Sequence, residues 1–124
     1  MNDLKISDVR AFVPARDFAQ SSSFYRALGW TEQRISDDLA LLEVAGHRFY
    51  LQNYYNKDWA DNFTLHISVE SAQDCYLRVR EVIGAGQFPG TRINAPEQQS
   101  YGALVAHAWD PAGVLLHFCQ WTKT

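Results

Sequence analysis

The chain has 124 residues, of which 47% are hydrophobic, 14% aromatic and 20% charged, and its formal net charge is −3. This length provides one hydrophobic core, so we expect a single domain over residues 1–124, and the apolar content excludes a disordered chain. The sequence has no run of Lys or Arg and no apolar run of membrane-spanning length, so we expect neither a nucleic-acid partner nor a membrane partner.

The first predicted elements are a strand over Val9–Ala15 and a helix that begins after Asp17. The Asp17 carboxylate can accept hydrogen bonds from the free N–H groups of the first helical turn, and Gln20 completes a capping-box pattern. The apolar residues of this helix have helical spacing and are Phe24, Ala27 and Leu28. Gly29 follows them and is the residue type at which helices commonly end.

Two strands are predicted after this helix, over Leu39–Val44 and Arg48–Tyr54, with a turn at Ala45–Gly46. A further strand covers Phe63–Val69, where apolar and polar residues alternate as in a strand with one buried face. The polar residues of that strand are Thr64, His66 and Ser68. We therefore expect these three side chains to share one face of the sheet.

A second helix is predicted from Ser71 to Gly84, because Ser71 is a favourable N-cap and Asp74 stands at the matching third position. The residues on its apolar face are Cys75, Val79, Val82 and Ile83. The segment Ile83–Ser100 is broken by several Gly and Pro residues, so we expect a loop around one short strand.

The chain ends in a predicted hairpin, with strands over Ala103–Trp109 and Val114–Gln120. The intervening Asp110-Pro111-Ala112-Gly113 sequence suits a tight type I turn. The order of one strand, one helix and further strands therefore occurs twice along the chain. Runs of strands after each helix favour an α+β fold over a doubly wound parallel sheet.

The two cysteines, Cys75 and Cys119, lie in unlike contexts, and neither has a CxxC neighbour. This excludes zinc-knuckle and thioredoxin-type sites, and we expect both residues to be reduced thiols. The segment from Met1 to Arg10 is polar and has no apolar signal core. These features predict a cytoplasmic protein.

Two stretches of the chain resemble a known superfamily. Residues 13–30, VPARDFAQSSSFYRALGW, are similar to the opening of vicinal-oxygen-chelate (VOC) proteins, and residues 109–118, WDPAGVLLHF, are similar to their closing hairpin. The superfamily includes glyoxalases, bleomycin-resistance proteins and extradiol dioxygenases. The likeness is closest to the bleomycin-resistance proteins, which share sequence pairs that correspond to Asp37-Asp38, Asp61-Asn62 and Tyr101-Gly102.

The resemblance implies a glyoxalase/bleomycin-resistance fold, in which two βαβββ modules form an open cleft. Module one would cover about residues 7–55 and module two about residues 62–121. The resemblance also implies a homodimer, in many relatives with exchanged N-terminal strands, that holds a small-molecule ligand in crevices between the subunits. A function in antibiotic resistance, by sequestration of an aromatic or cationic drug or metabolite, follows from the same likeness.

Enzymes of the superfamily hold a divalent metal ion with four side chains that point into the cleft. The matching positions in this chain fall near Arg10 or Ala11, at Gln52, at Thr64 and at His117. Arg is cationic, Ala has no donor atom, and Thr is a poor ligand, so the resemblance predicts no metal and no cofactor. A shifted site built from His66, His117 and Gln52 remains as an alternative.

The ligand-binding residues that the resemblance implies lie in the cleft and around its mouth. They are Asp38, Leu39, Gln52, Trp59, Asn62, His66, Ser68, Tyr101, Trp109 and His117. Aromatic faces and acidic groups at these positions suit a flat, cationic ligand. For each aromatic residue, packing in the core or at a dimer interface is the alternative role.

Three functions are compatible with these observations. The first is a metal-independent small-molecule binding protein of the bleomycin-resistance type, without catalytic residues. The second is a metal-dependent VOC enzyme of the lyase, isomerase or dioxygenase type with an unusual site. The third is a subunit or regulatory module whose cleft has no ligand. The binding protein would show saturable binding without a product. The enzyme would contain stoichiometric metal, and the module without a ligand would show no ligand response.

Overall fold

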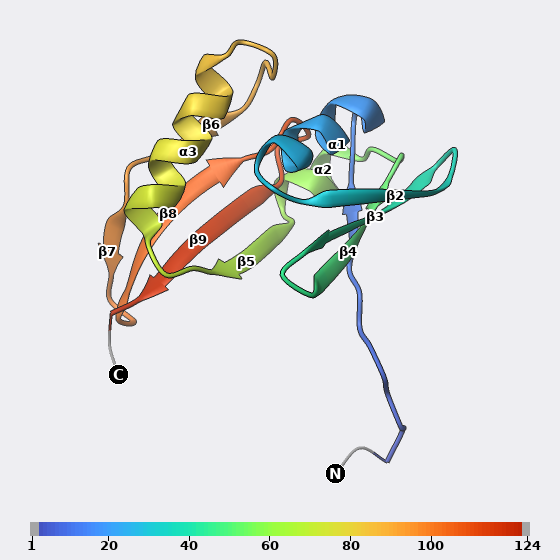
Figure 1. Ribbon diagram of the computed structural model, residues 1–124, viewed down its shortest axis with the longest axis horizontal. Coiled ribbons are helices and arrows are strands. Elements are labelled where there is room, and N and C mark those ends of the chain that lie inside the picture. Colours follow the sequence, from blue (N-terminus) through green and yellow to red (C-terminus); the bar gives the residue numbers. More distant parts are fainter. Residues whose placement is uncertain (1–2, 123–124) are drawn as a thin grey trace.

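The computed structural model describes residues 3–122 and contains two β-sheets with three helices (Figure 1). Sheet A has four strands in the order β1-β4-β3-β2, and sheet B has the order β5-β9-β8-β6, with the short strand β7 also paired to β8. The predicted α+β fold with two βαβββ modules is confirmed. None of the helices in residues 3–122 has the length and apolar character needed to cross a membrane.

Module one contains β1 (Phe12–Pro14), helix α1 (Phe18–Ala27), β2 (Thr31–Ser36), β3 (Leu39–Val44) and β4 (His47–Gln52). The strand β1 runs parallel to β4, and the other neighbours in sheet A are antiparallel. The β3–β4 hairpin turns tightly because Ala45 and Gly46 both have positive φ, 51° and 82°. Such a two-residue turn matches the twist of the strands that it joins.

Module two repeats this arrangement with β5 (Thr64–Ser68), helix α3 (Ala72–Gly84), β8 (Ala103–Trp109) and β9 (Leu115–Trp121). The strand β5 runs parallel to β9, as β1 does to β4. The short strands β6 (Arg92–Ile93) and β7 (Glu97–Gln99) both pair with β8 and together correspond to the single strand β2. Helix α2 (Lys57–Asp61) connects the two modules.

Side-chain caps determine where α1 and α3 begin. The Asp17 carboxylate accepts from the Gln20 backbone N–H, and the Ser71 hydroxyl accepts from the Asp74 backbone N–H, both at 3.0 Å. These bonds satisfy N–H groups that have no partner within a helix. The Gln20 side chain does not complete the predicted capping box, because its amide donates instead to the backbone oxygen of Gln87.

One hydrophobic core includes residues of both modules, from the helices α1 and α3 and from both sheets. The rings of Phe24 and Phe88 meet edge to face at 5.4 Å, which joins α1 to the segment after α3. At the centre of the molecule the buried Tyr25 hydroxyl donates to the Asp110 carboxylate at 2.6 Å. Asp110 also accepts from the backbone N–H groups of Ala112 and Val114, so it holds the β8–β9 turn and module one together.

Several elements differ from the sequence-based expectations. Strand β2 and helix α2 were not predicted, and the segment Ile83–Ser100 contains two short strands rather than one. The predicted strand over Val9–Ala15 is reduced to Phe12–Pro14. Residues 3–9 instead extend away from the rest of the molecule and are called the N-terminal arm below, whereas Arg10 and Ala11 bond to Tyr50 of β4 (Figure 1).

Candidate functional site

The two faces of sheet B have different environments. Leu65, Ile67 and Phe118 face the core, whereas the residues that alternate with them point to the opposite side. We call this opposite side the open face of sheet B. The strand residues that lie on it are Thr64, His66, Ser68, Ala103, Val105, His107, Trp109, Leu115, His117, Cys119 and Trp121. Three of them, Ala103, Val105 and Cys119, form a small buried cluster.

Three histidines form a row across the centre of the open face. His66 of β5 stands beside His117 of β9, and His117 stands opposite His107 of β8. The His107 and His117 rings lie 4.7 Å apart in an edge-to-face arrangement. Asp110 and Val114 form a hydrogen-bonded pair at the turn, and bonded and non-bonded pairs alternate outward from it. His107 and His117 are therefore a non-hydrogen-bonded pair, in which opposite side chains come closest. The row is therefore a direct result of the strand register.

The pKa of His117 is lowered, first because the ring is partly removed from water and then because His107 and His66 repel a positive charge there. Neither His107 nor His117 has a hydrogen-bond partner within residues 3–122. A histidine retained only for packing would normally be hydrogen bonded. These two half-buried rings are thus free to bind a proton or a ligand.

Aromatic groups flank the histidine row at both ends. At one end the Trp121 indole N–H donates to the Ser68 hydroxyl at 3.3 Å, and Ser68 lies 2.9 Å from His66 Nε2. The Ser68 hydroxyl accepts from the indole, and the tautomer of His66 decides which of the two groups donates in the bond between them. At the other end the Arg92 guanidinium lies over the Trp109 ring, 3.9 Å from its centroid. The open face therefore combines flat apolar surfaces with groups that carry or accept protons.

The structure divides the residues that the sequence singled out into three groups. His66, Ser68, Trp109 and His117 share the open face of sheet B, and the exposed Tyr101 reaches it through an edge contact with Trp121 at 6.0 Å. Leu39 and Gln52 are register partners in sheet A. Asp38 lies in the turn before β3, where its backbone oxygen accepts from the Asn53 backbone N–H.

The other two residues of that set belong to helix α2 and its end. The Trp59 ring packs against Tyr54 at 5.8 Å and against Phe63 at 6.1 Å. The Asn62 side chain donates to the backbone oxygen of Asp58 at 2.7 Å, which closes the helix. These contacts give both residues a role in the connection between the modules.

Sequence reasoning did not identify His107, Trp121 or Arg92. The predicted turn contained the signal for His107, because this residue lies three positions before Asp110 and His117 lies three positions after Val114. A hairpin register counted from the turn would have placed the two rings opposite each other. Arg92 meets Trp109 through the two-residue strand β6, which has no pattern of its own in the sequence.

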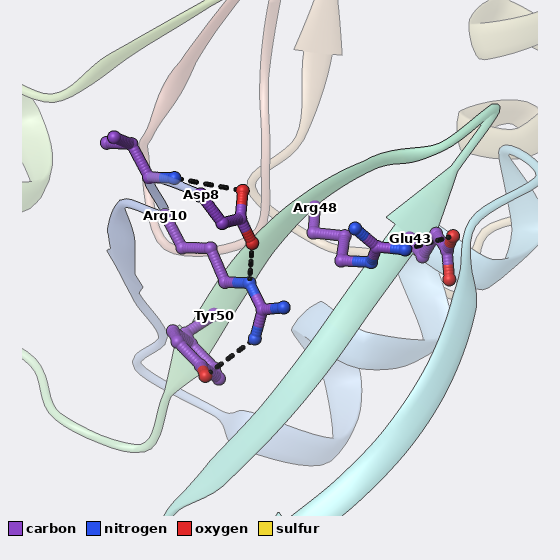
Figure 2. A network of polar contacts seen from close by, with 6 residues as sticks. Asp8, Arg10, Glu43, Arg48 and Tyr50 are labelled. Carbon is purple, nitrogen blue, oxygen red and sulfur yellow. Dashed lines mark hydrogen bonds and ion pairs between the residues drawn. The ribbon is translucent and has the colours of Figure 1, made fainter. Parts of the chain in front are cut away.

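The positions that match the superfamily metal ligands do not fit a divalent cation. Arg10 donates to the Tyr50 hydroxyl at 2.8 Å and to the Asp8 carboxylate at 2.7 Å, so a cation already stands there (Figure 2). The bonds to Tyr50 and Asp8 raise the pKa of Arg10 and keep it charged. Gln52 lies in sheet A, away from the histidine row of sheet B. Within residues 3–122 no group of three or more His, Cys, Asp or Glu is arranged to hold a metal ion.

A largely apolar cavity of about 600 Å³ lies where the β3–β4 hairpin meets the outer edge of β5. The rings of Trp30, Phe49 and Phe118 contribute to its lining, and His47 and Arg48 lie along its edge with His66. The volume is in the usual range of small-molecule sites. His66 thus borders both the open face of sheet B and this cavity.

The fold is similar to that of known binding proteins and enzymes. A bleomycin resistance determinant encoded on the transposon Tn5 is 24% identical, with a TM-score of 0.75 over 94% of this chain and 100% of that one. A bleomycin-binding protein solved with bleomycin is 22% identical, with a TM-score of 0.75 over 93% and 98% of the two chains. A lactoylglutathione lyase from Agrobacterium tumefaciens is 12% identical, with a TM-score of 0.66 over 93% and 94%.

No family model matches the sequence, and no curated protein matches it. At identities of 12% to 24% the structural likeness establishes the fold, which is the glyoxalase/bleomycin-resistance fold expected from the sequence. Both a drug-binding protein and an enzyme share this fold, so the side chains of the site have to distinguish between the two functions.

Proposed function

We propose that this chain is a metal-independent small-molecule binding protein of the bleomycin-resistance type, which sequesters an aromatic drug or metabolite on the open face of sheet B. The observation that carries the proposal is the combination of Trp109, Trp121 and the histidine row on one face. Indole faces provide stacking surface at a small cost in conformational entropy, and the imidazoles provide polar contacts. The similar bleomycin-binding structures support the same function.

The experiment that tests this function is isothermal titration calorimetry with bleomycin and with a panel of flat aromatic compounds. We expect saturable binding of at least one compound, which chromatography then recovers unchanged. The His117→Ala variant should bind it more weakly while keeping its thermal unfolding midpoint. A compound that is converted into a product would contradict the proposal, and so would a panel with no binder.

The partner that would complete the crevice is a second copy of the chain. The N-terminal arm exposes Leu4 and Val9 to 81% and 80%, and β1 is held to β4 over only three residues. An apolar segment that extends from the molecule is stabilised by burial against another subunit. The outer edge of β5 is open to accept it, because β5 is the terminal strand of sheet B. We therefore propose a homodimer with exchanged arms.

Sedimentation of the full chain tests the dimer. We expect the wild type to sediment as a dimer and a Leu4→Asp, Val9→Asp double variant to sediment as a monomer. Leu77→Asp is the matched control, because Leu77 is an apolar side chain on α3 that is 42% exposed and outside the arm. A monomeric wild type, or equal effects of the arm variant and the control, would exclude this assembly.

One observation favours a metal-dependent enzyme as the second candidate, namely the adjacency of His66 and His117, two of the three residues of the alternative metal site. Chelator-treated protein is titrated with zinc, nickel, manganese and ferrous iron, and thermal unfolding is followed. A metal that binds only the folded state raises the unfolding midpoint. Our proposal predicts no stoichiometric binding, whereas one ion per subunit that is lost in His117→Ala would favour the enzyme.

Both cysteines are free thiols, Cys119 buried and Cys75 half-buried. Burial raises the pKa of each thiol, which lowers the fraction of reactive thiolate. We propose on this basis that the protein functions in the cytoplasm, where thiols stay reduced.

A further inference from the structure

We propose that the ligand of the open face of sheet B is a flat aromatic acid, whose ring stacks on Trp109 and whose anionic group lies among the histidine row and Arg92. This inference rests on the proposed binding function and names the chemical class of its ligand. It departs from the cationic ligand that the resemblance to bleomycin-resistance proteins implies.

The cationic and titratable groups of the open face follow one another along it. Arg92 stands opposite Trp109, His107 follows Trp109 on the same side of β8, and His117 and His66 continue the series across β9 and β5. One permanent cation and three groups that become cations on protonation thus form a continuous strip. Within residues 3–122 Arg92 takes part in no ion pair, so its charge is not neutralised by the protein.

Other charged groups surround this strip on both sides. On the β7 side Glu97 stands opposite Val105, and beyond the end of β5 the exposed Glu70 follows Val69. On the other side of β5 the cavity brings His47 and Arg48 to the edge of His66. Arg48 is paired with Glu43 at 3.4 Å.

Glu97 therefore lies diagonally across from His107 on the same face, Glu70 lies beyond the end of β5, and the central His117 has imidazoles as its register neighbours. The two charged neighbours that act on the His117 ring are both histidines. An anion placed at the centre would meet no carboxylate among these central neighbours.

Proton binding and ligand binding are linked at His117. In the free protein a proton on His117 is disfavoured, and the pKa of this ring is lowered, because desolvation and two imidazoles oppose the charge. An anionic ligand supplies the missing opposite charge and raises the pKa of the same ring. The complex should therefore take up protons, and its affinity should rise as the pH falls from 8 to 6. A cationic ligand should show the opposite trend.

The test uses three compounds with one ring system and different charge: 2-naphthoate, 2-naphthamide and 2-naphthylmethylammonium. Calorimetric titrations of the full-length protein are run at pH 8, 7 and 6, in two buffers with different heats of ionisation to count protons. We expect naphthoate to bind most tightly and the ammonium compound most weakly. Each proton taken up should increase the naphthoate affinity by at most about tenfold per pH unit.

The three compounds separate failure of this inference from failure of the proposed function. Equal or tighter binding of the ammonium compound would overturn the acidic ligand and leave the binding function intact. Naphthoate binding without proton uptake would show that the anionic group does not lie among the histidine row. No binding of any naphthyl compound would overturn the inference, while binding of another aromatic compound in the wider panel would still support the function.

Arg92 has a matched control within the chain. Arg80 on α3 also lies over an aromatic ring, 5.3 Å from the centroid of Tyr76, but outside the open face. We expect Arg92→Gln to weaken naphthoate binding by about threefold to tenfold, because a solvent-exposed cation contributes a screened charge. Naphthamide binding should change little, and Arg80→Gln should change neither.

His117→Gln provides the second variant, and it should reduce both naphthoate affinity and the number of protons taken up. Unfolding midpoints close to that of the wild type show that the variants fold. A loss of naphthoate and naphthamide affinity by the same factor in Arg92→Gln would contradict the charge argument, as would unchanged binding in both variants.

Discussion

Sheets A and B have equivalent strand orders, yet their outward-facing surfaces carry different chemistry. In each sheet the first strand of the module runs parallel to its last strand, β1 to β4 and β5 to β9. The last strand pairs on its other side with an antiparallel neighbour. On the outward side of sheet A, Glu43 stands opposite Arg48, and Arg10 is bound to Asp8 and Tyr50 (Figure 2). On the open face of sheet B the corresponding region carries three imidazoles and two indoles.

This difference shows that the strand framework and the binding chemistry depend on separate features of the sequence. The framework follows from alternating apolar residues and tight turns, which both modules share. The binding chemistry depends on the polar and aromatic residues that alternate with those apolar residues along the strands. Sheet A neutralises its charges internally, whereas sheet B leaves His107, His117 and Arg92 without an acidic partner within residues 3–122.

The largest expected effect on stability comes from removing the Asp110 carboxylate, whose hydrogen bonds connect the two modules. Asp110→Ala leaves the buried Tyr25 hydroxyl and two backbone N–H groups of the β8–β9 turn without their acceptor. We expect the free energy of unfolding to fall by roughly 3 kcal/mol, because buried polar groups without partners are costly. Urea unfolding measures this change. Tyr25→Phe, which removes one of these three bonds, should cost less, and an equal cost would contradict the role of the turn.

The two hairpin turns offer a matched comparison between the modules. Gly46 and Gly113 have φ values of 82° and 92°, so Ala is strained at both positions. A Cβ at Gly46 meets nothing within 4 Å, whereas a Cβ at Gly113 lies 3.2 Å from Asp61 Oδ1. We expect Gly46→Ala to lower the free energy of unfolding by about 1 kcal/mol and Gly113→Ala by about 2 kcal/mol. A larger cost at Gly46 would reverse the comparison.

The Asp110 carboxyl also makes the stability of the protein depend on pH. Burial raises the pKa of Asp110 from 3.8 to about 6, against the opposing effect of its hydrogen bonds to Tyr25 and the turn. The folded chain therefore holds this proton to a higher pH than the unfolded chain does. The stabilisation is complete below pH 3.8 and is lost as the pH rises through about 6.

Between pH 7 and pH 5 the contribution of Asp110 to the free energy of unfolding should increase by about 1 kcal/mol. Urea unfolding at the two pH values measures it, and Asp110→Asn is the control because it keeps an acceptor oxygen but does not titrate. The difference between wild type and Asp110→Asn isolates this carboxyl from the other titrating groups. The same pH dependence in both proteins would assign the effect to other groups.

The smallest effect is expected for the charge pair of sheet A. Glu43→Gln removes the 3.4 Å contact with Arg48, whose side chain is 38% exposed. Solvent screens such a pair, so the free energy of unfolding should fall by less than about 0.5 kcal/mol. Binding of naphthoate to sheet B should stay within a factor of two of the wild type (roughly the effect of a distant screened charge). A marked loss of binding would show that both sheets contact the ligand.

Most of the framework could be predicted from the sequence because its signals are local. Asp17 and Ser71 cap the two long helices where capping chemistry predicts them, and Asp110 opens the expected turn. Strand β2 was missed because its sequence, TEQRIS, is polar and mostly exposed, so it shows no alternation. Its place in sheet A follows from pairing with β3, which is a long-range property.

The candidate site was only partly predictable for the same reason. The alternation in β5 identified His66 and Ser68 correctly as one face of a strand. The contacts of Trp121 with Ser68 and of Arg92 with Trp109 join residues that are far apart in the sequence. The length of the N-terminal arm was also not predictable, because Val9 has strand-forming character but finds no neighbouring strand within residues 3–122.

The central claim is that the open face of sheet B binds the ligand, and backbone amide shifts in NMR spectra of ¹⁵N-labelled protein test it most directly. The protein is titrated with 2-naphthoate at pH 6. The account predicts saturable shifts in β5, β8 and β9, centred on His66, His107 and His117, with little change in β2 and β3. Shifts confined to sheet A or to α2 would contradict it.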